Sequence, residues 1–337
     1  MQKPQHILII RLSAMGDVAM LIPVIYAFAK AYPETKITVL SKPFFKAIID
    51  TIPNVHFIAA ETNTRHKGIV GIWKLSRELK QLGITHIADT HNVLRSKVLR
   101  FFLRLPNAKI DKGRAEKKAL TSPNNSFFKP LKTTVQRYVE VFKQLGFSEI
   151  IPQILSRPNI DREVIEIVGK TKKKLIGIAP FAAHQGKQYP LDLMKEVLQK
   201  LDQQSGIQLF LFGAPNEKEV LDSLTEDCEN AIVVAGVLRF PKEINLIAQL
   251  DAMLSMDSGN GHLAAMYGVP TVSVWGVTHP YAGFAPLYQE AHCLLSDRDQ
   301  YPAIPTSIYG HKVPEGYEEV MRTITPQTIV DRLMSLL

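Results

Sequence analysis

Cysteine and long apolar runs are scarce in this 337-residue chain. Its only cysteines, Cys228 and Cys293, lie far apart and have neither metal-ligand nor redox spacing, which excludes a disulfide framework and favours a reducing, cytoplasmic setting. The longest apolar run near the N-terminus, residues 19–29, contains a proline and is far shorter than the roughly 20 residues that span a bilayer. We therefore expect a soluble protein without a signal peptide or transmembrane helix.

The chain also lacks the glycine fingerprint of dinucleotide-binding Rossmann folds. Its first strand-to-helix turn, residues 11–17, contains one glycine, and no acid ends the next predicted strand at residues 36–40. A nicotinamide or flavin cofactor is therefore not expected. Asp17 opens the helix after this turn. It suits either a helix cap or a carboxylate at the end of the first strand, where open α/β sheets place their chemistry.

Acidic residues are scarce in the first half of the chain. Residues 1–160 hold 25 Lys and Arg against 10 Asp and Glu, whereas residues 161–337 hold 15 against 22. The densest basic stretch, residues 95–118, is either a solvated surface or a dock for an anionic partner. Because no recognition motif or interleaved aromatic residues accompany this charge, nucleic acid is not the expected partner. Anionic lipid or an acidic saccharide remains.

Short apolar strands alternate with helical periods along the chain. Strands are expected at 7–10, 36–40, 55–58, 86–88, 175–179, 208–212, 232–234, 252–256 and 271–275, with helices at 17–31, 43–50, 70–82, 95–103, 190–204, 215–226, 241–250 and 261–267. This alternation is typical of parallel sheets wrapped by helices. We expect an α/β protein with two doubly wound domains, residues 1–158 and 159–325, and a C-terminal helix at 326–337 that could pack back on the first domain.

Residues 257–262, Asp-Ser-Gly-Asn-Gly-His, join a predicted strand to a predicted helix. The turn gathers backbone N–H groups of Ser258, Gly259 and Asn260 at a helix N-terminus, a place that favours an anion. A phosphorylated ligand is expected there. His262 follows in the first helical turn, as a ligand residue or as a histidine satisfied within the fold.

Several motifs, in order, resemble glycosyltransferase family 9, the ADP-heptose:lipopolysaccharide heptosyltransferases. They are Met15-Gly16-Asp17 with Pro23 and Tyr32-Pro33, a lysine followed by an aromatic residue and proline in 181–190, a glycine loop ending in glutamate at 212–217, and the segments 257–262, 268–272 and 275–280. The resemblance covers nearly the whole chain. It implies a GT-B fold, in which two Rossmann-like domains face a central cleft, with the acceptor on the first domain and the donor on the second.

The resemblance also implies a reaction, the inverting transfer of a heptose or related sugar from ADP-heptose or another nucleotide sugar to a lipopolysaccharide inner-core acceptor. Asp17 would be the general base, and Lys187 would supply a cation to the phosphates. The remaining donor-site residues would be Ser258, Gly259, Asn260, His262 and Asp257 around the pyrophosphate, Glu217 at the ribose and Leu238 at the base. Ser13, Arg95 and Arg114 are candidate acceptor-binding residues.

Most of these residues also suit a purely structural role. Lys187 taken alone is an ordinary surface lysine, Glu217 suits the N-terminus of a helix, and Leu238 suits a packed core. Two alanines, Ala182 and Ala183, stand where family members often offer small hydroxyl residues to the phosphates. One or two phosphate hydrogen bonds would then be missing, at about 1.5–3 kcal/mol for each charge-assisted bond.

The only Asp-x-Asp in the chain is residues 297–299, which we interpret as a solvated loop, so no metal is expected. No cofactor is expected beyond the substrate nucleotide sugar. The implied partners are that donor, an anionic lipid-linked saccharide acceptor and the inner face of the cytoplasmic membrane, bound peripherally by a monomer. Two alternatives remain, a nucleotide-sugar epimerase or hydrolase of the same fold and a non-catalytic module that binds anionic glycans.

Overall fold

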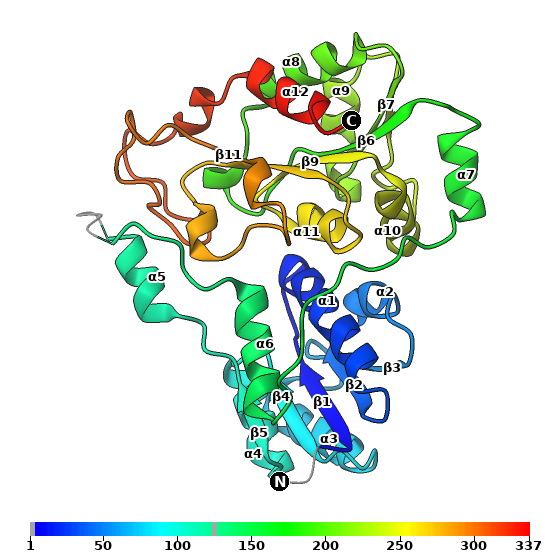
Figure 1. Ribbon diagram of the computed structural model, residues 1–337, viewed down its shortest axis with the longest axis vertical. Helices are drawn as coiled ribbons and strands as arrows, with labels where there is room; N and C mark the ends of the chain where they lie inside the picture. Colours follow the sequence, from blue (N-terminus) through cyan, green and yellow to red (C-terminus); the bar gives the residue numbers. More distant parts are fainter. Residues whose placement is uncertain (1–3, 123–126) are drawn as a thin grey trace. The chain divides into compact units, whose positions relative to one another are not determined.

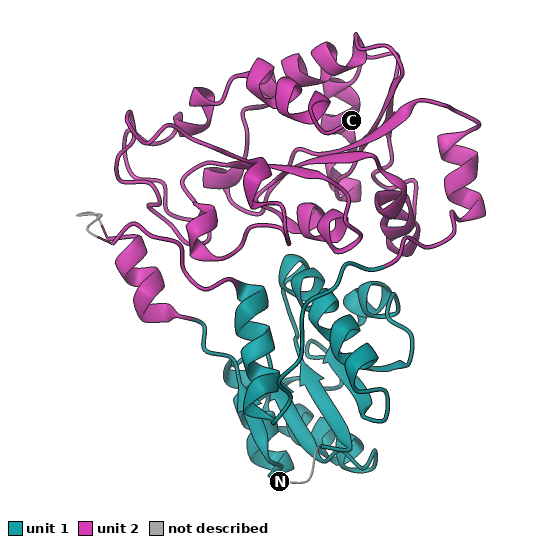
Figure 2. Cartoon of the chain, in the orientation of Figure 1, with its two compact units in different colours: residues 1–112, 134–155 teal, residues 113–133, 156–337 magenta. Residues whose placement is uncertain are grey.

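The computed structural model describes residues 4–122 and 127–337. The chain divides into two compact units (Figure 2), unit 1 with residues 1–112 and 134–155, and unit 2 with residues 113–133 and 156–337. Each unit is built around one parallel sheet, as the alternating pattern predicts. The last crossing from unit 1 to unit 2, after residue 155, lies near the expected boundary, whereas residues 113–133 depart from a simple two-part division.

Unit 1 contains a five-stranded sheet in the order β3-β2-β1-β4-β5 (Figure 1). Its strands are β1 (His6–Ile10), β2 (Lys36–Ser41), β3 (Val55–Ala59), β4 (His86–Asp89) and β5 (Asn107–Lys109), and its helices are α1 (Met15–Ala31), η1 (Pro43–Phe45), α2 (Lys46–Ile49), α3 (Gly68–Lys80), α4 (Leu94–Leu103) and α6 (Thr134–Gln144). Because β1 pairs in parallel with both β2 and β4, the direction of winding reverses between β1 and β4. Such a switch point is where open α/β sheets bind ligands.

Helices cover both faces of this sheet. On one face α1 packs against α6 and α2, with the ring of Phe28 4.8 Å from those of Phe142 and Phe147. On the other face α3 packs against α4, and Leu75 and Leu99 join the core beneath these two helices. The central strand β1 is therefore buried on both sides, which explains its continuous apolar sequence.

Unit 2 contains a six-stranded parallel sheet in the order β11-β10-β9-β6-β7-β8. Its strands are β6 (Lys174–Ala179), β7 (Ile207–Leu211), β8 (Ala231–Val233), β9 (Ala252–Met256), β10 (Thr271–Trp275) and β11 (Cys293–Leu295). Its helices are α5 (Arg114–Leu120), α7 (Arg162–Val168), η2 (Gln185–Lys187), α8 (Leu191–Asp202), η3 (Pro215–Glu217), α9 (Lys218–Leu224), α10 (Phe240–Gln249), α11 (Gly259–Met266), η4 (Pro280–Ala282), η5 (Glu290–His292), η6 (Val320–Thr323) and α12 (Pro326–Met334). Here the winding reverses between β6 and β9.

The C-terminal helix α12 packs within unit 2. Its buried side chains Ile329, Val330 and Leu333 belong to the same core as those of α8. The hydroxyl of Tyr189 donates a hydrogen bond of 2.6 Å to the carbonyl oxygen of Ile324, just before the helix. The apolar stripe of α12 was visible in the sequence, but a stripe does not specify which surface completes it.

Residues 113–133, which we call the basic insert, lie between two segments of unit 1 but belong to unit 2. Leu120 and Leu131 pack with Ala282, and the guanidinium carbon of Arg298 lies 3.4 Å from the centroid of the Phe128 ring. Gly283 (φ +84°) makes this approach possible, since a Cβ there would lie 2.7 Å from the carbonyl oxygen of Lys132. The insert is therefore fixed to unit 2 by packing.

The basic insert changes how charge divides between the units. It holds five Lys and Arg and one acid, Glu116. Unit 1 then has 19 Lys and Arg against 9 Asp and Glu, and unit 2 has 21 against 23. Part of the cationic excess of the first half of the chain therefore belongs to unit 2, through the basic insert. Unit 1 remains strongly basic, and unit 2 is nearly neutral.

Candidate active site

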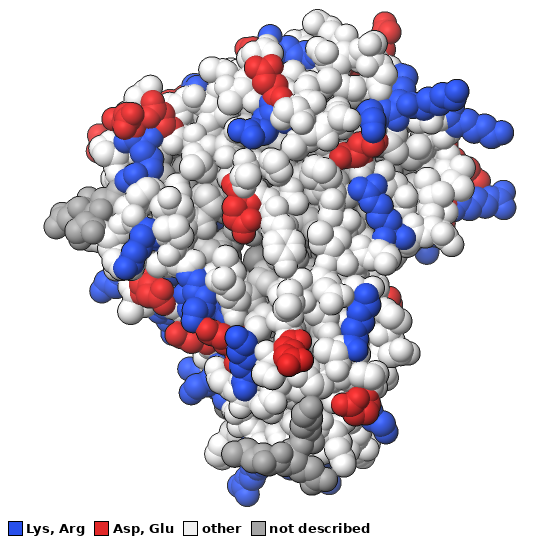
Figure 3. Space-filling model, in the orientation of Figure 1, with Lys and Arg blue, Asp and Glu red and all other residues white. Residues whose placement is uncertain are grey.

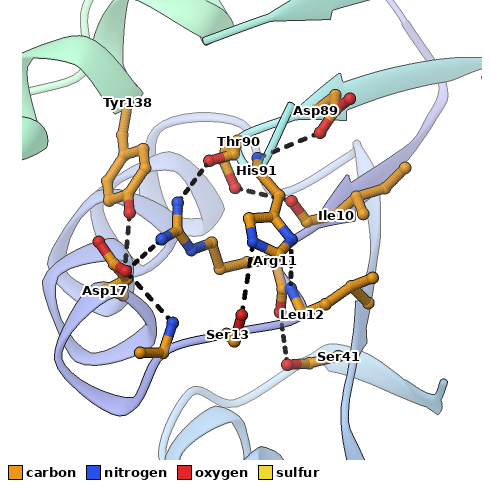
Figure 4. A network of polar contacts seen from close by, with 11 residues as sticks. Ile10, Arg11, Leu12, Ser13, Asp17, Ser41, Asp89, Thr90, His91 and Tyr138 are labelled. Atoms are coloured by element: carbon orange, nitrogen blue, oxygen red, sulfur yellow. Dashed lines mark hydrogen bonds and ion pairs between the residues drawn. The ribbon is translucent and has the colours of Figure 1, made fainter. Parts of the chain in front are cut away.

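The loops that follow β1 and β4 are joined at the switch point of unit 1 (Figure 4). Arg11 directly follows β1, and its Nη1 donates a hydrogen bond of 2.8 Å to the carbonyl oxygen of Thr90. In return, the hydroxyl of Thr90 donates to the carbonyl oxygen of Ile10 at 2.9 Å. These bonds fix the turn that leads into α1.

Asp17 lies in the first turn of α1 with its carboxylate held from two sides. Its Oδ2 forms an ion pair with the buried guanidinium of Arg11 and accepts a hydrogen bond of 3.2 Å from the N–H of Ala14. The hydroxyl of Tyr138, on α6, donates to the carbonyl oxygen of Asp17 at 3.1 Å. The side chain is 26% exposed. Asp17 thus caps its helix and also presents an accessible carboxylate at the end of the first strand.

His91 is a polar residue of this site that sequence reasoning missed. It is 8% exposed, and burial together with the nearby Arg11 cation lowers its pKa to about 3, so the imidazole is neutral near pH 7. Its Nδ1 accepts a hydrogen bond of 3.3 Å from the N–H of Leu12, which assigns the ring proton to Nε2. Nε2 lies 3.5 Å from the hydroxyl of Ser13. The sequence feature that could have pointed to His91 is the polar run Asp-Thr-His-Asn at 89–92, which directly follows a predicted strand.

Asp89 anchors the loop that carries His91. Its buried Oδ1 accepts hydrogen bonds from the N–H groups of His91 at 3.1 Å and Asn92 at 2.7 Å. Its Oδ2 forms an ion pair of 3.0 Å with Nε of Arg100 on α4. The buried carboxylate of Asp89 therefore fixes the backbone that carries His91.

The three predicted acceptor-binding residues do not lie on one element. Ser13 is partly buried in the β1–α1 turn beside His91. Arg95 is exposed on α4 of unit 1, and Arg114 is exposed at the start of α5 in unit 2. Of these residues, only Ser13 lies close to Asp17 in the sequence, in the turn that leads into α1.

The corresponding switch point of unit 2 holds Lys187 and Asp257, which come from the loops after β6 and β9. Nζ of Lys187 lies 2.7 Å from Oδ2 of Asp257, and the two side chains are only 13% and 5% exposed. The hydroxyl of Thr278 donates to the same oxygen at 3.0 Å. Lys187 is therefore not an ordinary surface lysine. Its ammonium group is mostly buried, and removing either partner of a buried ion pair leaves the other charge uncompensated.

Glycines shape the channel for the Lys187 stem. A Cβ on Gly310, where φ is +82°, would lie 2.5 Å from Cγ of Lys187. A Cβ on Gly186 would lie 2.5 Å from the side chain of Val277 and 2.7 Å from the carbonyl oxygen of Gly310. The loop around Gly310 was not anticipated, since its contact with the lysine spans more than a hundred residues of sequence.

The N-terminus of α11 lies at the end of β9, next to Asp257. Ser258 is its N-cap residue, yet the buried Oγ of Ser258 makes no hydrogen bond with any residue that the structure describes. Gly261 is required by close packing, since a Cβ there would lie 2.5 Å from Oγ of Ser255. His262, one residue further, is buried. Because no cap side chain engages the first-turn amides of α11, they remain suited to an anion.

Glu217 and Leu238 have evident structural roles. Oε2 of Glu217 accepts a hydrogen bond of 2.6 Å from the N–H of Ala214, which caps η3. Leu238 is 7% exposed, whereas the preceding Val237 is 58% exposed. Glu217 therefore serves as a helix cap and Leu238 as a buried side chain. The contacts of Glu217 with the ribose and of Leu238 with the base remain predictions.

The Asp-x-Asp segment forms a local turn. Oδ1 of Asp297 accepts a hydrogen bond of 2.8 Å from the N–H of Asp299, and Nε of Arg298 donates to the carbonyl oxygen of Ile304 at 2.8 Å. Across residues 4–122 and 127–337, no group of three or more His, Cys, Asp or Glu side chains is arranged to hold a metal ion. Within the same residues no helix combines the length and apolarity that crossing a membrane requires.

Comparison with known families decides the class of this protein. The family model described as glycosyltransferase family 9 (heptosyltransferase) matches residues 72–310. The chain belongs to glycosyltransferase family 9. The resemblance inferred from the ordered motifs is thereby confirmed, and this family 9 member is a glycosyltransferase of the lipopolysaccharide heptosyltransferase type.

Individual relatives and structures agree with this assignment. The family 9 chain is 24% identical to the lipopolysaccharide core heptosyltransferase OpsX of Haemophilus influenzae over 83% of this chain and 81% of the relative. Its fold is similar to that of a family 9 glycosyltransferase from Veillonella parvula (TM-score 0.80, 19% identity, 98% and 97% coverage). It is also similar to Escherichia coli ADP-heptose lps heptosyltransferase II (TM-score 0.72, 20% identity, 98% of both chains). The expected GT-B fold class is confirmed.

Proposed function

We propose that this family 9 glycosyltransferase transfers a heptose, or a closely related sugar, from ADP-heptose or a related nucleotide sugar to an anionic inner-core acceptor of lipopolysaccharide, with inversion. The observation that carries the proposal is the pair of switch-point sites, an accessible carboxylate in unit 1 and a buried lysine beside a helix N-terminus in unit 2. The names of the relative from H. influenzae and the enzyme from E. coli support the acceptor and donor classes.

The donor diphosphate would bind at unit 2. Lys187 would contact the phosphates while Asp257 holds its ammonium group in place. The hydroxyl of Ser258, which has no partner among the described residues, would donate a hydrogen bond and so replace part of what Ala182 and Ala183 lack. The first amides of α11, at Gly259 and Asn260, and the side chain of His262 would complete the pyrophosphate site. Glu217 would contact the ribose and Leu238 the base.

The acceptor hydroxyl would lose its proton to Asp17. Both contacts of this carboxylate, to Arg11 and to the N–H of Ala14, are made by Oδ2, so Oδ1 remains for the incoming hydroxyl. The acceptor oxygen then attacks the anomeric carbon of the donor sugar as the bond to the diphosphate breaks, which inverts the configuration.

The departing nucleoside diphosphate gains negative charge in the transition state. Lys187 and the amides of α11 supply positive charge to this group from fixed positions, which stabilises the transition state. Because these groups already provide the countercharge, we expect transfer to proceed without an added divalent metal.

Three further expectations concern the setting of the reaction. The basic unit 1, with exposed Arg95, and the basic insert, with exposed Arg114, suit an acceptor that carries carboxylates and phosphates. Ser13, beside Asp17, would contact the acceptor near the reacting hydroxyl. We expect a cytoplasmic monomer that binds the inner face of the cytoplasmic membrane peripherally.

The test is Asp17→Asn, measured by transfer and by ADP binding. Loss of a general base should lower the transfer rate by roughly 10²–10⁴-fold, while ADP affinity stays at the wild-type value. Asp50→Asn, which removes an exposed carboxylate at the end of α2 in the same unit, is the matched control and should transfer normally. Unchanged turnover in Asp17→Asn would remove this residue from the mechanism. Release of ADP without an acceptor would instead indicate a hydrolase or epimerase.

A further inference from the structure

The outward face of α3 exposes large apolar side chains that the proposed reaction does not use. Ile69, Val70 and Trp73 are 68%, 66% and 47% exposed. They lie at positions i, i+1 and i+4 of the helix, and therefore share one side of it. The opposite side of α3 is buried through Ile72, Leu75 and Leu79. The exposed apolar face is thus additional to the one that the fold needs.

The neighbouring helix α4 extends this surface. Leu94 and Phe101 are 77% and 67% exposed, and Lys97 lies between them on the same stripe at spacings of three and four residues. Since α3 and α4 pack side by side over the same core, their outer faces form one surface of unit 1. We call it the α3–α4 surface. Its residues are Ile69, Val70, Trp73, Lys74, Arg77, Lys80, Leu94, Lys97 and Phe101.

The charge on the α3–α4 surface has one sign. None of the exposed residues of α3 and α4 is acidic. The one acid in these two helices, Glu78, is only partly exposed and forms an ion pair with Arg65. The guanidinium of Arg77 lies 5.9 Å above the ring of Trp73. Acidic and basic side chains are intermingled on the face shown in Figure 3, so the absence of exposed acid on α3 and α4 is a local property.

This combination selects one kind of occupant. Tryptophan and aliphatic side chains ringed by Lys and Arg are the composition of helices that lie in a membrane interface, where the rings and chains enter the headgroup region and the cations meet anionic lipid. A second copy of this chain would bring the same cations to the contact, and like charges oppose such a dimer. Charge complementarity therefore favours an anionic bilayer.

We propose that unit 1 docks on anionic membranes through the α3–α4 surface, with Ile69, Val70 and Trp73 inserted at the level of the lipid headgroups. The proposal rests on the proposed function only for the identity of the membrane, the one that holds the lipid-linked acceptor. The docking itself requires neither donor nor acceptor, so it can be tested without catalysis.

Trp73 provides the first measurement. The chain has two tryptophans, and the other, Trp275, is 1% exposed in the core of unit 2. The fluorescence of Trp73 should shift to shorter wavelength when vesicles of phosphatidylglycerol and phosphatidylcholine are added, and not with phosphatidylcholine alone. High salt should weaken the binding, since it screens the cations. An unchanged spectrum with anionic vesicles would overturn the proposal.

Variants that retain Trp73 separate the apolar and charged contributions. Each Lys near an anionic surface contributes about 1 kcal/mol, or roughly fivefold in affinity. The triple variant Lys74→Gln, Lys80→Gln, Lys97→Gln should therefore bind anionic vesicles roughly 100-fold more weakly. The double variant Ile69→Ser, Val70→Ser should reduce both the binding and the spectral shift.

Controls come from exposed residues of unit 2. Lys170→Gln with Lys172→Gln, and Ile165→Ser with Val220→Ser, alter the same residue types elsewhere and should bind as the wild type does. Vesicle binding equal in test and control variants would overturn the proposal. So would a dimer in sedimentation analysis that Ile69→Ser, Val70→Ser abolishes, since the surface would then be a self-interface. ADP binding should be unchanged in all variants. Transfer to a soluble acceptor fragment without vesicle binding would contradict the docking inference alone.

Discussion

Asp17 and Asp257 both lie at the switch point of a parallel sheet, Asp17 in the segment after β1 and Asp257 directly after β9, and each pairs with a cation. Their surroundings differ. Asp17 is 26% exposed and engages Arg11 and an amide through one oxygen, whereas Asp257 is 5% exposed and engages Lys187 and Thr278. One topology thus provides an accessible carboxylate that suits proton transfer and a buried one that suits holding a lysine in place.

The largest expected effect on stability follows from this difference. Asp257→Asn removes the charge that compensates buried Lys187, and should lower the free energy of unfolding by about 3 kcal/mol or more. Asp17→Asn also removes the countercharge of a buried cation, Arg11, but should cost less, about 1–2 kcal/mol, because Asp17 itself is partly solvated, the asparagine can still accept from Ala14 and Arg11 keeps its bond to Thr90. Urea unfolding of both variants measures the difference. Equal losses would mean that the two carboxylates serve the same structural purpose.

His91 makes the stability of unit 1 depend on pH. Its pKa of about 3 in the folded chain lies below the ordinary value of 6.5, so the unfolded chain takes up the proton first. Stability should therefore be intact above pH 6.5 and decline as pH falls towards 3, by about 1.4 kcal/mol per pH unit. Between pH 7 and pH 5 the loss should be about 2 kcal/mol.

The variant His91→Gln should lack the His91 share of that decline, whereas buried His279 of unit 2, with a pKa lowered to about 4, should still contribute its own. Denaturant unfolding at pH 7 and pH 5, compared between wild type and variant, isolates the contribution of this residue from that of the carboxylates. His56→Gln, at an exposed histidine of the same sheet, should retain the wild-type dependence. If His91→Gln and wild type lose stability in parallel, the imidazole is not held neutral in the folded chain.

Gly310 tests how closely unit 2 constrains its lysine. Gly310→Ala should cost about 1–2 kcal/mol from its positive φ and weaken ADP binding roughly tenfold, because the new Cβ would displace the Lys187 stem. Gly206 has φ of +78°, and a Cβ added there would meet nothing within 4 Å, so Gly206→Ala should carry the strain alone. Calorimetric titration with ADP compares the two variants. Equal ADP affinities would show that the glycine serves the backbone only.

The smallest expected effect concerns Ser258. Because its hydroxyl is unbonded among the described residues, Ser258→Ala should leave the free energy of unfolding nearly unchanged. The same change should weaken ADP binding by about 1.5 kcal/mol, if the hydroxyl donates to a phosphate. Ser335→Ala, at an exposed serine near the C-terminus, is the control for the titration. A stability loss without an affinity loss would assign Ser258 to the fold rather than to the donor.

The sequence was sufficient for the elements that are buried on both sides. β1 and β9 appear as mostly apolar runs because helices cover both faces of each sheet, and all the predicted strands and helices are present. The edge strands β5 and β11 were missed, since three-residue strands such as Asn107–Lys109 carry no periodic signal. Helices α5, α6 and α7 were also not anticipated.

The candidate site divides in the same way. Asp17, Lys187 and Asp257 could be singled out because each follows a strand and belongs to an ordered motif. The contacts that these residues make could not be predicted from the sequence. The pairing of Lys187 with Asp257 spans 70 positions, and the bond of His91 to Leu12 spans 79. Such contacts arise from the order of strands in the sheet, which the hydrophobic pattern of one chain does not determine.

The basic insert has a consequence for attempts to divide or recombine this protein. Because residues 113–133 are packed on unit 2, a fragment that starts at residue 156 would leave Ala282, Tyr281 and Phe284 without the side chains that cover them. A fragment that ends at residue 155 would contain the basic insert but lack the unit 2 residues, such as Ala282, on which it packs. Unit 2 is therefore not a contiguous stretch of the sequence. Chimeras that exchange it between relatives should include residues 113–133 as a second crossover segment.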